Sequence, residues 1–374
     1  MSILLVACGS SKNASVIPED EPEKKPKVTN TFKLKQRWST SVGGKYGVDF
    51  TGFKLEISEN IAYTASPAGD VRATNIETGK RVWKIDLRDK LSAGVGLGVN
   101  HVYVATEEGV AIALSKKDGK ELWRYQASSE ILTSPAASKE TVIVRSSDGK
   151  VIGLSVEDGS KQWIIQRDLP RLSLRGDSQP LIIQGVAVVG FASGNMLAIR
   201  LLDGAVIWDV PISTPRGSNE IERIVDVFSK PLVIGQTLFA NTYQGNVVAI
   251  DIPTRGLDWR AQQSSYRDLS TDGSNLYLSD EKGLITALDA SDGSVLWTVD
   301  DLKFRNVSAP TVVGSYLMVF GNDKDMYLLS LSDGSLFGRY KISGKNIIGN
   351  PVINGNQFYI LTSGGDLRAF ELTQ

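Results

Sequence analysis

The chain has 374 residues, more than the roughly 250–300 at which a single hydrophobic core stops growing, so it must hold several domains or a repeat. Its 41 basic and 42 acidic residues give a net charge of −1, which argues against a nucleic-acid partner. The single cysteine excludes an internal disulfide and a thiolate metal cluster. The single histidine, His101, lies in the strand-like run NHVYVAT and is interpreted as structural, which argues against Ser-His-Asp and Cys-His catalysis.

The N-terminus contains a short apolar run, residues 3–7, followed directly by Cys8. The run lacks the positively charged region that opens a complete signal peptide, so we interpret residues 1–7 as the remnant of one. The segment LVAC that ends at Cys8 resembles the bacterial lipobox, which implies cleavage before Cys8 and acylation of its thiol. The alternative is a frayed terminus with an accidental cysteine.

The residues after Cys8 are expected to be a tether. Gly9 and Ser10 stand where an aspartate would resemble an inner-membrane retention signal, which favours the outer membrane. Residues 11–30 are rich in Pro, Lys and Glu and nearly free of large apolar side chains, a composition typical of disorder. Because no run of about 20 apolar residues occurs, the lipid would be the only membrane anchor. We therefore expect a lipidated cysteine and tether over 8–30 and a folded domain over 31–374.

The rest of the chain is built from a repeat of about 40 residues. Each unit carries a strand, a tight turn with glycine, and a second strand with tryptophan four residues after that glycine. The repeated segment spans residues 73–83, 113–123, 153–163, 198–208, 249–259, 287–297 and 328–338. The glycine comes one residue late in the fifth unit, and Phe337 replaces tryptophan in the seventh. About four short strands per unit and no long helix predict an all-β fold, a β-propeller of four-stranded antiparallel blades.

The spacing of prolines and aromatic residues predicts the number of blades. The distance from the proline that opens an inner strand to the aromatic residue is 28 for Pro135, Pro180 and Pro231. Counted from Pro351, 28 residues would run past the last residue, 374, so the final blade lacks its outer strand. The segment KQRWST around Trp38 is the missing strand. We therefore predict eight blades, in a ring that the N-terminal strand closes by pairing with the C-terminal strands.

The repeated tryptophans are interpreted as packing groups between adjacent blades. A WD40 assignment fails because only Trp208 is followed by aspartate. The pattern is similar to the tryptophan-docked propellers of quinoprotein dehydrogenases and their non-enzymatic relatives.

Two connectors between blades are longer than the others. The distance from an aromatic residue to the next proline is 12–14 in regular units but 17 after Trp163 and 23 after Trp208. The extra residues, in 164–179 and 209–230, join neighbouring blades on one face and predict a composite surface. In the second insertion Asn219 and the spacing of its apolar residues favour a short amphipathic turn of helix.

The apolar residues of these insertions allow two interpretations. Leu172, Leu174 and the isoleucines could pack the two insertions against each other. Alternatively, some stay exposed beside Arg175 and form an apolar patch with a charged rim, as partner sites do. An arginine at such a patch adds a planar set of donors for a carboxylate or a backbone.

The lipobox, the charged tether, the eight blades and the segments SLSLRGDS and NEIERIVDV together resemble the BamB family, the propeller lipoproteins of the outer-membrane β-barrel assembly machinery. The resemblance implies a scaffold without cofactor, metal or catalytic residue that binds the periplasmic POTRA domains of BamA and assists outer-membrane protein folding and insertion. It implies partner-binding roles for Leu172, Leu174, Arg175 and Asp226, lipidation at Cys8, and a propeller that faces the periplasm. It also implies a monomer inside a hetero-oligomeric complex, in possible contact with nascent outer-membrane proteins. The family pattern Asp-Val-Asp ends here in Phe228, so one acidic contact is missing.

Two other functions compete with the scaffold. A quinoprotein-type dehydrogenase shares the architecture, but it needs a calcium-bound quinone and usually a vicinal cysteine pair, and the only cysteine here is in the lipobox. The run GVGLG at 94–98 lacks the spacing of a nucleotide-binding loop and is better explained as a glycine-rich inner strand. A surface lipoprotein that binds a polysaccharide or a host ligand is the second alternative, and exposed aromatic residues along a groove would distinguish it.

Overall fold

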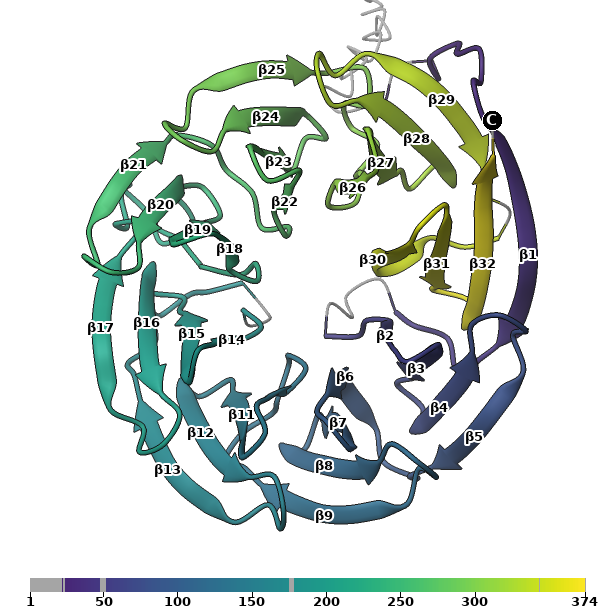
Figure 1. Ribbon diagram of the computed structural model, residues 1–374. Helices are drawn as coiled ribbons and strands as arrows, with labels where there is room; N and C mark the ends of the chain where they lie inside the picture. The colour runs from purple at the N-terminus through teal and green to yellow at the C-terminus, as the bar shows by residue number, and fades with distance from the viewer. Residues whose placement is uncertain (1–21, 23, 48–51, 175–177, 343, 374) are drawn as a thin grey trace, which may run out of the picture.

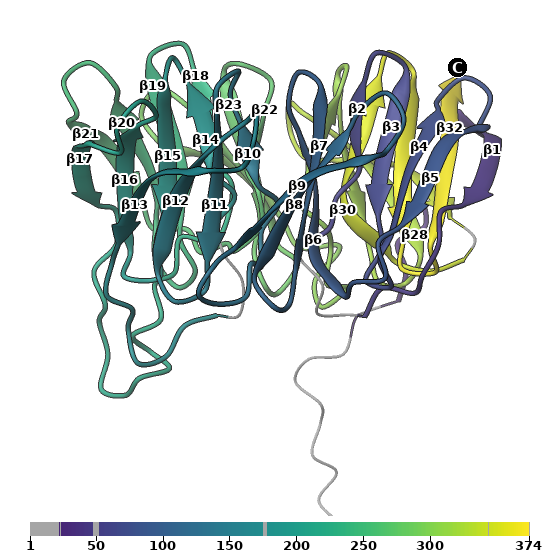
Figure 2. The ribbon, with the colours of Figure 1, turned by 90° about the horizontal axis from the view of Figure 1, so that it is seen from below.

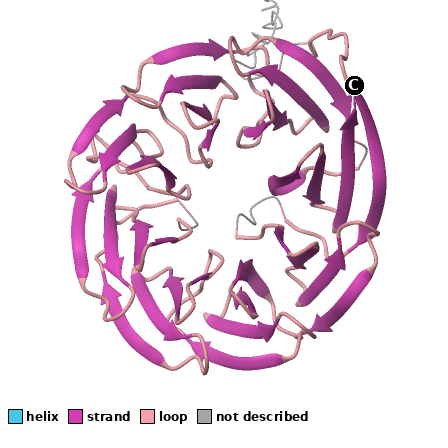
Figure 3. Cartoon of the chain, in the orientation of Figure 1, coloured by secondary structure: helices cyan, strands magenta, loops and turns pink. Residues whose placement is uncertain are grey.

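The strands form a ring of eight four-stranded antiparallel sheets (Figure 1). This computed structural model describes residues 22, 24–47, 52–174, 178–342 and 344–373. Over those residues the secondary structure consists of strands and turns, with no helix. The predicted eight-bladed β-propeller is confirmed (Figure 3). A helix long and apolar enough to cross a membrane is absent from the described ranges.

Each blade is named by its position along the chain. Blades one to four consist of β2 (Glu56–Ser58), β3 (Ile61–Ala65), β4 (Asp70–Asn75), β5 (Arg81–Asp86); β6 (Leu91–Leu97), β7 (His101–Thr106), β8 (Val110–Ser115), β9 (Glu121–Gln126); β10 (Ala136–Ala137), β11 (Thr141–Ser146), β12 (Lys150–Ser155), β13 (Lys161–Gln166); and β14 (Leu181–Ile183), β15 (Val186–Gly190), β16 (Asn195–Arg200), β17 (Val206–Pro211). Blades five to eight consist of β18 (Leu232–Ile234), β19 (Thr237–Asn241), β20 (Val247–Asp251), β21 (Leu257–Ala261); β22 (Ser270–Thr271), β23 (Asn275–Ser279), β24 (Ile285–Asp289), β25 (Val295–Val299); β26 (Thr311–Val313), β27 (Tyr316–Phe320), β28 (Asp325–Ser330), β29 (Leu336–Lys341); and β30 (Ile347–Asn354), β31 (Gln357–Thr362), β32 (Asp366–Thr373), β1 (Lys33–Ser41).

The N-terminal strand completes the eighth blade. β1 pairs antiparallel with β32, from Lys33 opposite Thr373 to Ser41 opposite Asp366. Trp38 of β1 donates its indole N–H to the Ile76 carbonyl of blade one at 2.8 Å. The predicted ring closure is therefore confirmed, and the last blade has the same four strands as the others.

Six of the seven tryptophans dock their blade onto a glycine turn of the next blade. The indole of Trp163, in blade three, donates to the Leu201 carbonyl of blade four at 2.7 Å and covers Gly204. Gly204 has φ +74°, and a β-carbon there would lie 2.8 Å from the Trp163 ring, so glycine is required both for the backbone conformation and for the contact. The same pairing occurs between Trp38 and Gly79, Trp83 and Gly119, Trp123 and Gly159, Trp259 and Gly293, and Trp297 and Gly334.

The turn between β20 and β21 departs from this arrangement. Its glycine, Gly256, comes one residue late, and Arg255 adopts the positive φ, 63°, that glycine adopts in the other turns. The Arg255 guanidinium donates to the Ile207 carbonyl at 3.5 Å, beside Trp208. The irregular spacing in the sequence thus corresponds to a turn in which an arginine side chain reaches the preceding blade.

All connectors from an outer strand to the next inner strand emerge on one face of the ring, together with the turns between the second and third strands. We call this the loop face. Two of its long connectors are residues 167–180, the first loop, and residues 212–231, the second loop. Figure 2 shows the two loops side by side, projecting beyond the other connectors below blades three to five. The predicted composite surface on neighbouring blades is confirmed.

Candidate partner-binding site

The structure describes three of the four residues to which the resemblance assigns partner binding. Leu172 lies in the first loop with 42% of its surface exposed, and Leu174 is half-buried. Asp226, in the second loop, is 3% exposed. Arg175 and the lipidation site Cys8 lie outside the described residues.

The two loops are joined by hydrogen bonds to each other. The Leu174 backbone N–H donates to Oδ2 of Asp226 at 2.5 Å. Four residues later, the Ser178 hydroxyl donates to the Ser229 carbonyl at 2.8 Å. Sequence positions about 50 residues apart are therefore brought together at two points, and Asp226 supports the backbone of the first loop.

A buried arginine holds the C-terminal end of the first loop. Arg145, on β11 of blade three, is 2% exposed. Its Nη1 donates to the Ser178 carbonyl at 3.3 Å and to the Gly190 carbonyl of blade four at 2.5 Å. The guanidinium carbon also lies 4.9 Å from the centre of the Phe191 ring, a cation–π contact. Arg145 thus links two blades and the loop that connects them.

A lysine from blade one contacts the same end of the loop. Lys54 precedes β2, and its Nζ donates to Oε1 of Gln179 at 2.9 Å. Burial lowers the pKa of Lys54, while the neighbouring Glu56 carboxylate opposes this shift. Lys54 leads into blade one and Gln179 leads into blade four. The contact therefore links the end of the first loop to a distant blade of the ring.

The second loop forms a turn and then an extended segment, so the predicted turn of helix is wrong. The Asn219 side chain does accept the Glu222 N–H, at 3.0 Å, as a capping residue would. Hydrogen bonds from the backbone and the hydroxyl of Ser218 lower the pKa of the exposed Glu222 carboxyl. However, residues 224–227 are all buried in succession, which an amphipathic helix does not allow. The extended segment is held instead by the Val227 N–H, which donates to the Phe191 carbonyl at 3.2 Å.

Both interpretations of the loop apolar residues apply, to different residues. Ile224 and Val225 are 8% and 3% exposed and pack inside. Leu172 and Leu169 are both 42% exposed, and Ile221 is 66% exposed. Ile224 and Val225 therefore pack inside, while Leu169 and Leu172 of the first loop and Ile221 of the second loop are presented to solvent.

Sequence reasoning missed an aromatic and arginine cluster next to the second loop. The Tyr243 N–H donates to the Asp226 carbonyl at 3.1 Å, and its ring lies 6.4 Å from that of Tyr266. The Arg267 guanidinium lies 4.4 Å above the Tyr266 ring, and burial lowers its pKa. All three side chains are half-exposed on the loop face. They sit in turns of regular length, so no irregularity in the repeat marks them.

The single histidine has structural contacts. His101, at the start of β7, stacks on Tyr103 with ring centres 5.9 Å apart, and burial lowers its pKa. Within the described ranges, no group of three or more His, Cys, Asp or Glu side chains is arranged to hold a metal ion.

Comparison with solved structures supports the fold. BamB from Moraxella catarrhalis superposes with a TM-score of 0.83 at 24% identity, over 91% of this chain and all of that one. A quinohemoprotein alcohol dehydrogenase from Comamonas testosteroni gives a TM-score of 0.69 at 13% identity, over 90% of this chain and 76% of that one. At such identities the likeness concerns the architecture alone.

Comparison of sequences identifies the family. A relative from Pseudomonas aeruginosa named outer membrane protein assembly factor BamB is 42% identical over 372 residues, covering 100% of this chain and 97% of the relative. A relative of the same name from Escherichia coli is 34% identical over 350 residues, covering 91% and 89%. The family model described as outer membrane protein assembly factor BamB matches residues 67–299 and 285–374. The chain therefore belongs to the BamB family of outer membrane protein assembly factors.

Proposed function

We propose that this protein is a non-enzymatic scaffold of the outer-membrane β-barrel assembly complex, where it binds the periplasmic POTRA domains of BamA and assists the folding and insertion of outer-membrane proteins. The names of its relatives support the assembly role. The observation that carries the proposal is the hydrogen bond between Leu174 N–H and Asp226, which joins the first and second loops into one surface.

The surface formed by the first and second loops combines exposed apolar side chains with charged ones, as partner sites do. Leu172 is the apolar anchor, with Leu174 beside it and Arg175 as the polar clamp. Asp226 acts by positioning, because its buried carboxylate fixes the backbone from which Leu174 projects. Ile221 adds exposed apolar area from the second loop.

The membrane attachment is also part of the proposal. Residues 1–7 are the remnant of a signal peptide, Cys8 carries the lipid, and the propeller of residues 31–374 stands in the periplasm at the outer membrane. Acyl chains on one cysteine are sufficient for stable anchoring once at least two are present.

The test is binding of the full chain, with Cys8→Ser to prevent acylation, to purified BamA POTRA domains. We expect Arg175→Glu and the double variant Leu172→Ala/Leu174→Ala each to weaken binding by about tenfold or more, since truncated interface anchors cost roughly 1–2 kcal/mol or more. Isothermal titration calorimetry gives the affinity, and circular dichroism confirms that each variant folds.

A matched control shows whether weaker binding comes from the loop surface or from the loss of any exposed leucine. Leu202 is 81% exposed in the β16–β17 turn, on the face opposite the loops. Leu202→Ala should bind like the unchanged chain. If the loop variants fold and bind as tightly as the Leu202→Ala variant, BamA is bound through another face of the propeller. If the unchanged chain does not bind either, a polysaccharide or host ligand becomes the better proposal.

A further inference from the structure

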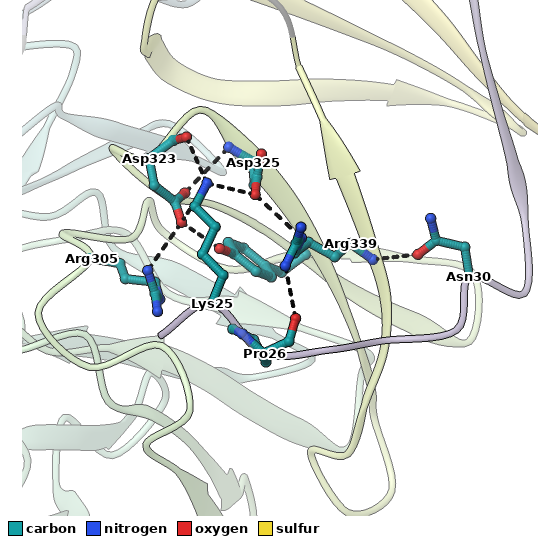
Figure 4. Close-up of polar contacts among 8 residues, drawn as sticks. Lys25, Pro26, Asn30, Arg305, Asp323, Asp325 and Arg339 are labelled. Atoms are coloured by element: carbon teal, nitrogen blue, oxygen red, sulfur yellow. Dashed lines mark hydrogen bonds and ion pairs between the residues drawn. The ribbon is translucent and has the colours of Figure 1, made fainter. Parts of the chain in front are cut away.

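The turn between β27 and β28 in blade seven carries a pocket whose two carboxylates, Asp323 and Asp325, contact Lys25 of the distant N-terminal segment (Figure 4). Lys324, Arg339 and Lys341 also line this pocket, which we call the acidic pocket after its two carboxylates. Asp325 is 4% exposed, and its Oδ2 lies 2.8 Å from Nζ of Lys25 and 3.4 Å from Nε of Arg339. Lys25 precedes Asp325 by 300 residues. Of these two cation contacts of the buried carboxylate, the shorter one is therefore made by the N-terminal segment.

The second carboxylate of the pocket is held from inside the propeller. Asp323 accepts the Tyr327 hydroxyl at 2.5 Å and lies 3.2 Å from Nη1 of Arg305. Burial and the bond to Asp323 raise the pKa of Tyr327. Lys25 also donates to the Asp323 carbonyl at 3.2 Å. The pocket is thus a preformed group of acceptors, and its outer opening is occupied by an ammonium group.

The rest of the N-terminal segment follows the outer strand β29. Nη1 of Arg339 donates to the Pro26 carbonyl at 2.9 Å, and the Arg339 N–H donates to the Asn30 side chain at 2.8 Å. At the other end of the segment, the Tyr340 hydroxyl donates to the Phe32 carbonyl at 2.9 Å. The segment was expected to be a disordered tether through residue 30, but residues 25–32 lie against blade seven.

The direction of the segment follows from its two ends. The Phe32 ring lies 4.9 Å from that of Tyr316, which starts β27 on the face opposite the loops. Lys25 reaches the turn that ends β27, and this turn belongs to the loop face. Lys25 therefore lies at the loop face, the same side as Leu172.

We propose that this acidic pocket is the docking site of the chain's own N-terminal segment, and that docking makes the tether leave the propeller on the loop face. The consequence for the membrane rests on the proposed function, because it requires a lipid at Cys8. From Cys8 to Lys25 the chain has 17 residue steps, a reach of at most about 60 Å, against 25 steps and about 85 Å from Cys8 to Lys33. Docking therefore shortens the free tether and starts it on the face that carries the partner surface.

The docking is tested by the distance between two spin labels on the full chain with Cys8→Ser. One label replaces Lys24, and the other replaces Asp301, an exposed residue of the connector between blades six and seven. The docked segment should give one narrow distance distribution. Lys25→Glu and Asp325→Asn should each shift most of the population to a broad distribution at longer distances, because each removes the ion pair between Lys25 and Asp325.

Lys27→Glu is the matched control, because it makes the same charge change two residues away. Among the described residues, Lys27 makes no side-chain hydrogen bond or ion pair, so this variant should keep the narrow distribution. A broad distribution in the unchanged chain, or a narrow one in both Lys25→Glu and Asp325→Asn, would overturn the docking. The measurement contains no BamA, so its outcome is independent of the binding test. The lipid at Cys8 that the membrane consequence requires is checked separately by mass spectrometry of protein extracted from membranes.

Discussion

Each docked tryptophan depends on a single glycine of the following blade. The glycine supplies a positive φ that other residues adopt at a cost, and its missing side chain lets the indole ring lie directly on the turn. These two requirements can be separated, because other glycines of the propeller have the same φ with open space around them. The repeated Asp-Gly turn is thus a feature of blade packing as well as of hairpin formation.

Gly159→Ala and Gly185→Ala should differ strongly in stability. Gly159 has φ +74°, and a β-carbon there would lie 2.6 Å from the Trp123 ring. Gly185 has φ +79° and nothing within 4 Å of that position. Alanine at Gly185 should cost about 1–2 kcal/mol for the left-handed backbone, and alanine at Gly159 about 1–3 kcal/mol more for overpacking. Denaturant titration of both variants measures the difference, and equal costs would show that the ring contact contributes nothing.

The first loop owes its position to elements that are not its sequence neighbours. Its middle is bound to the second loop through Asp226, and its end is bound to Arg145 of blade three and Lys54 of blade one. The connector lengths predicted that the two loops share a surface. They did not predict these contacts, because a buried arginine inside a strand looks like any other residue of the alternating pattern.

Arg145→Met should loosen the first loop and destabilise the propeller. The substitution leaves the Ser178 and Gly190 carbonyls without their donor, at a cost of about 2–4 kcal/mol. Arg200→Met is the control, because the exposed Arg200 side chain pairs with the nearby Asp203, so its loss should cost much less than the loss of Arg145. Hydrogen exchange of residues 170–180 should accelerate in Arg145→Met alone. Unchanged exchange there would mean that the loop is held by other contacts.

At the scale of the whole molecule, the pairing of β1 with β32 closes the ring and leaves the outer edge of β32 covered. β1 covers the whole length of β32, and Trp38 docks this last blade onto blade one. Without β1, the backbone groups of β32 would form an exposed edge, which promotes pairing with other molecules.

A chain that begins at residue 42 should therefore self-associate and unfold at a lower temperature than one that begins at residue 22. Both lack the lipidation site, so the comparison isolates β1 and the docked segment. Light scattering after size-exclusion chromatography gives the oligomeric state, and thermal denaturation gives the stability. A shorter chain that stays monomeric and equally stable would show that the ring does not need its closing strand.

Fold class, blade number and ring closure could be read from the sequence, because they follow from a local pattern repeated at constant spacing. The 28-residue distance from proline to aromatic residue needs no knowledge of contacts, and the shortfall after Pro351 required a strand from elsewhere. The tertiary structure alone decided which loop side chains are exposed, that Asp226 is buried, and that Lys25 reaches Asp325. These features depend on residues tens to hundreds of positions apart, and the shape of the ring, which no local pattern encodes, determines whether such residues meet.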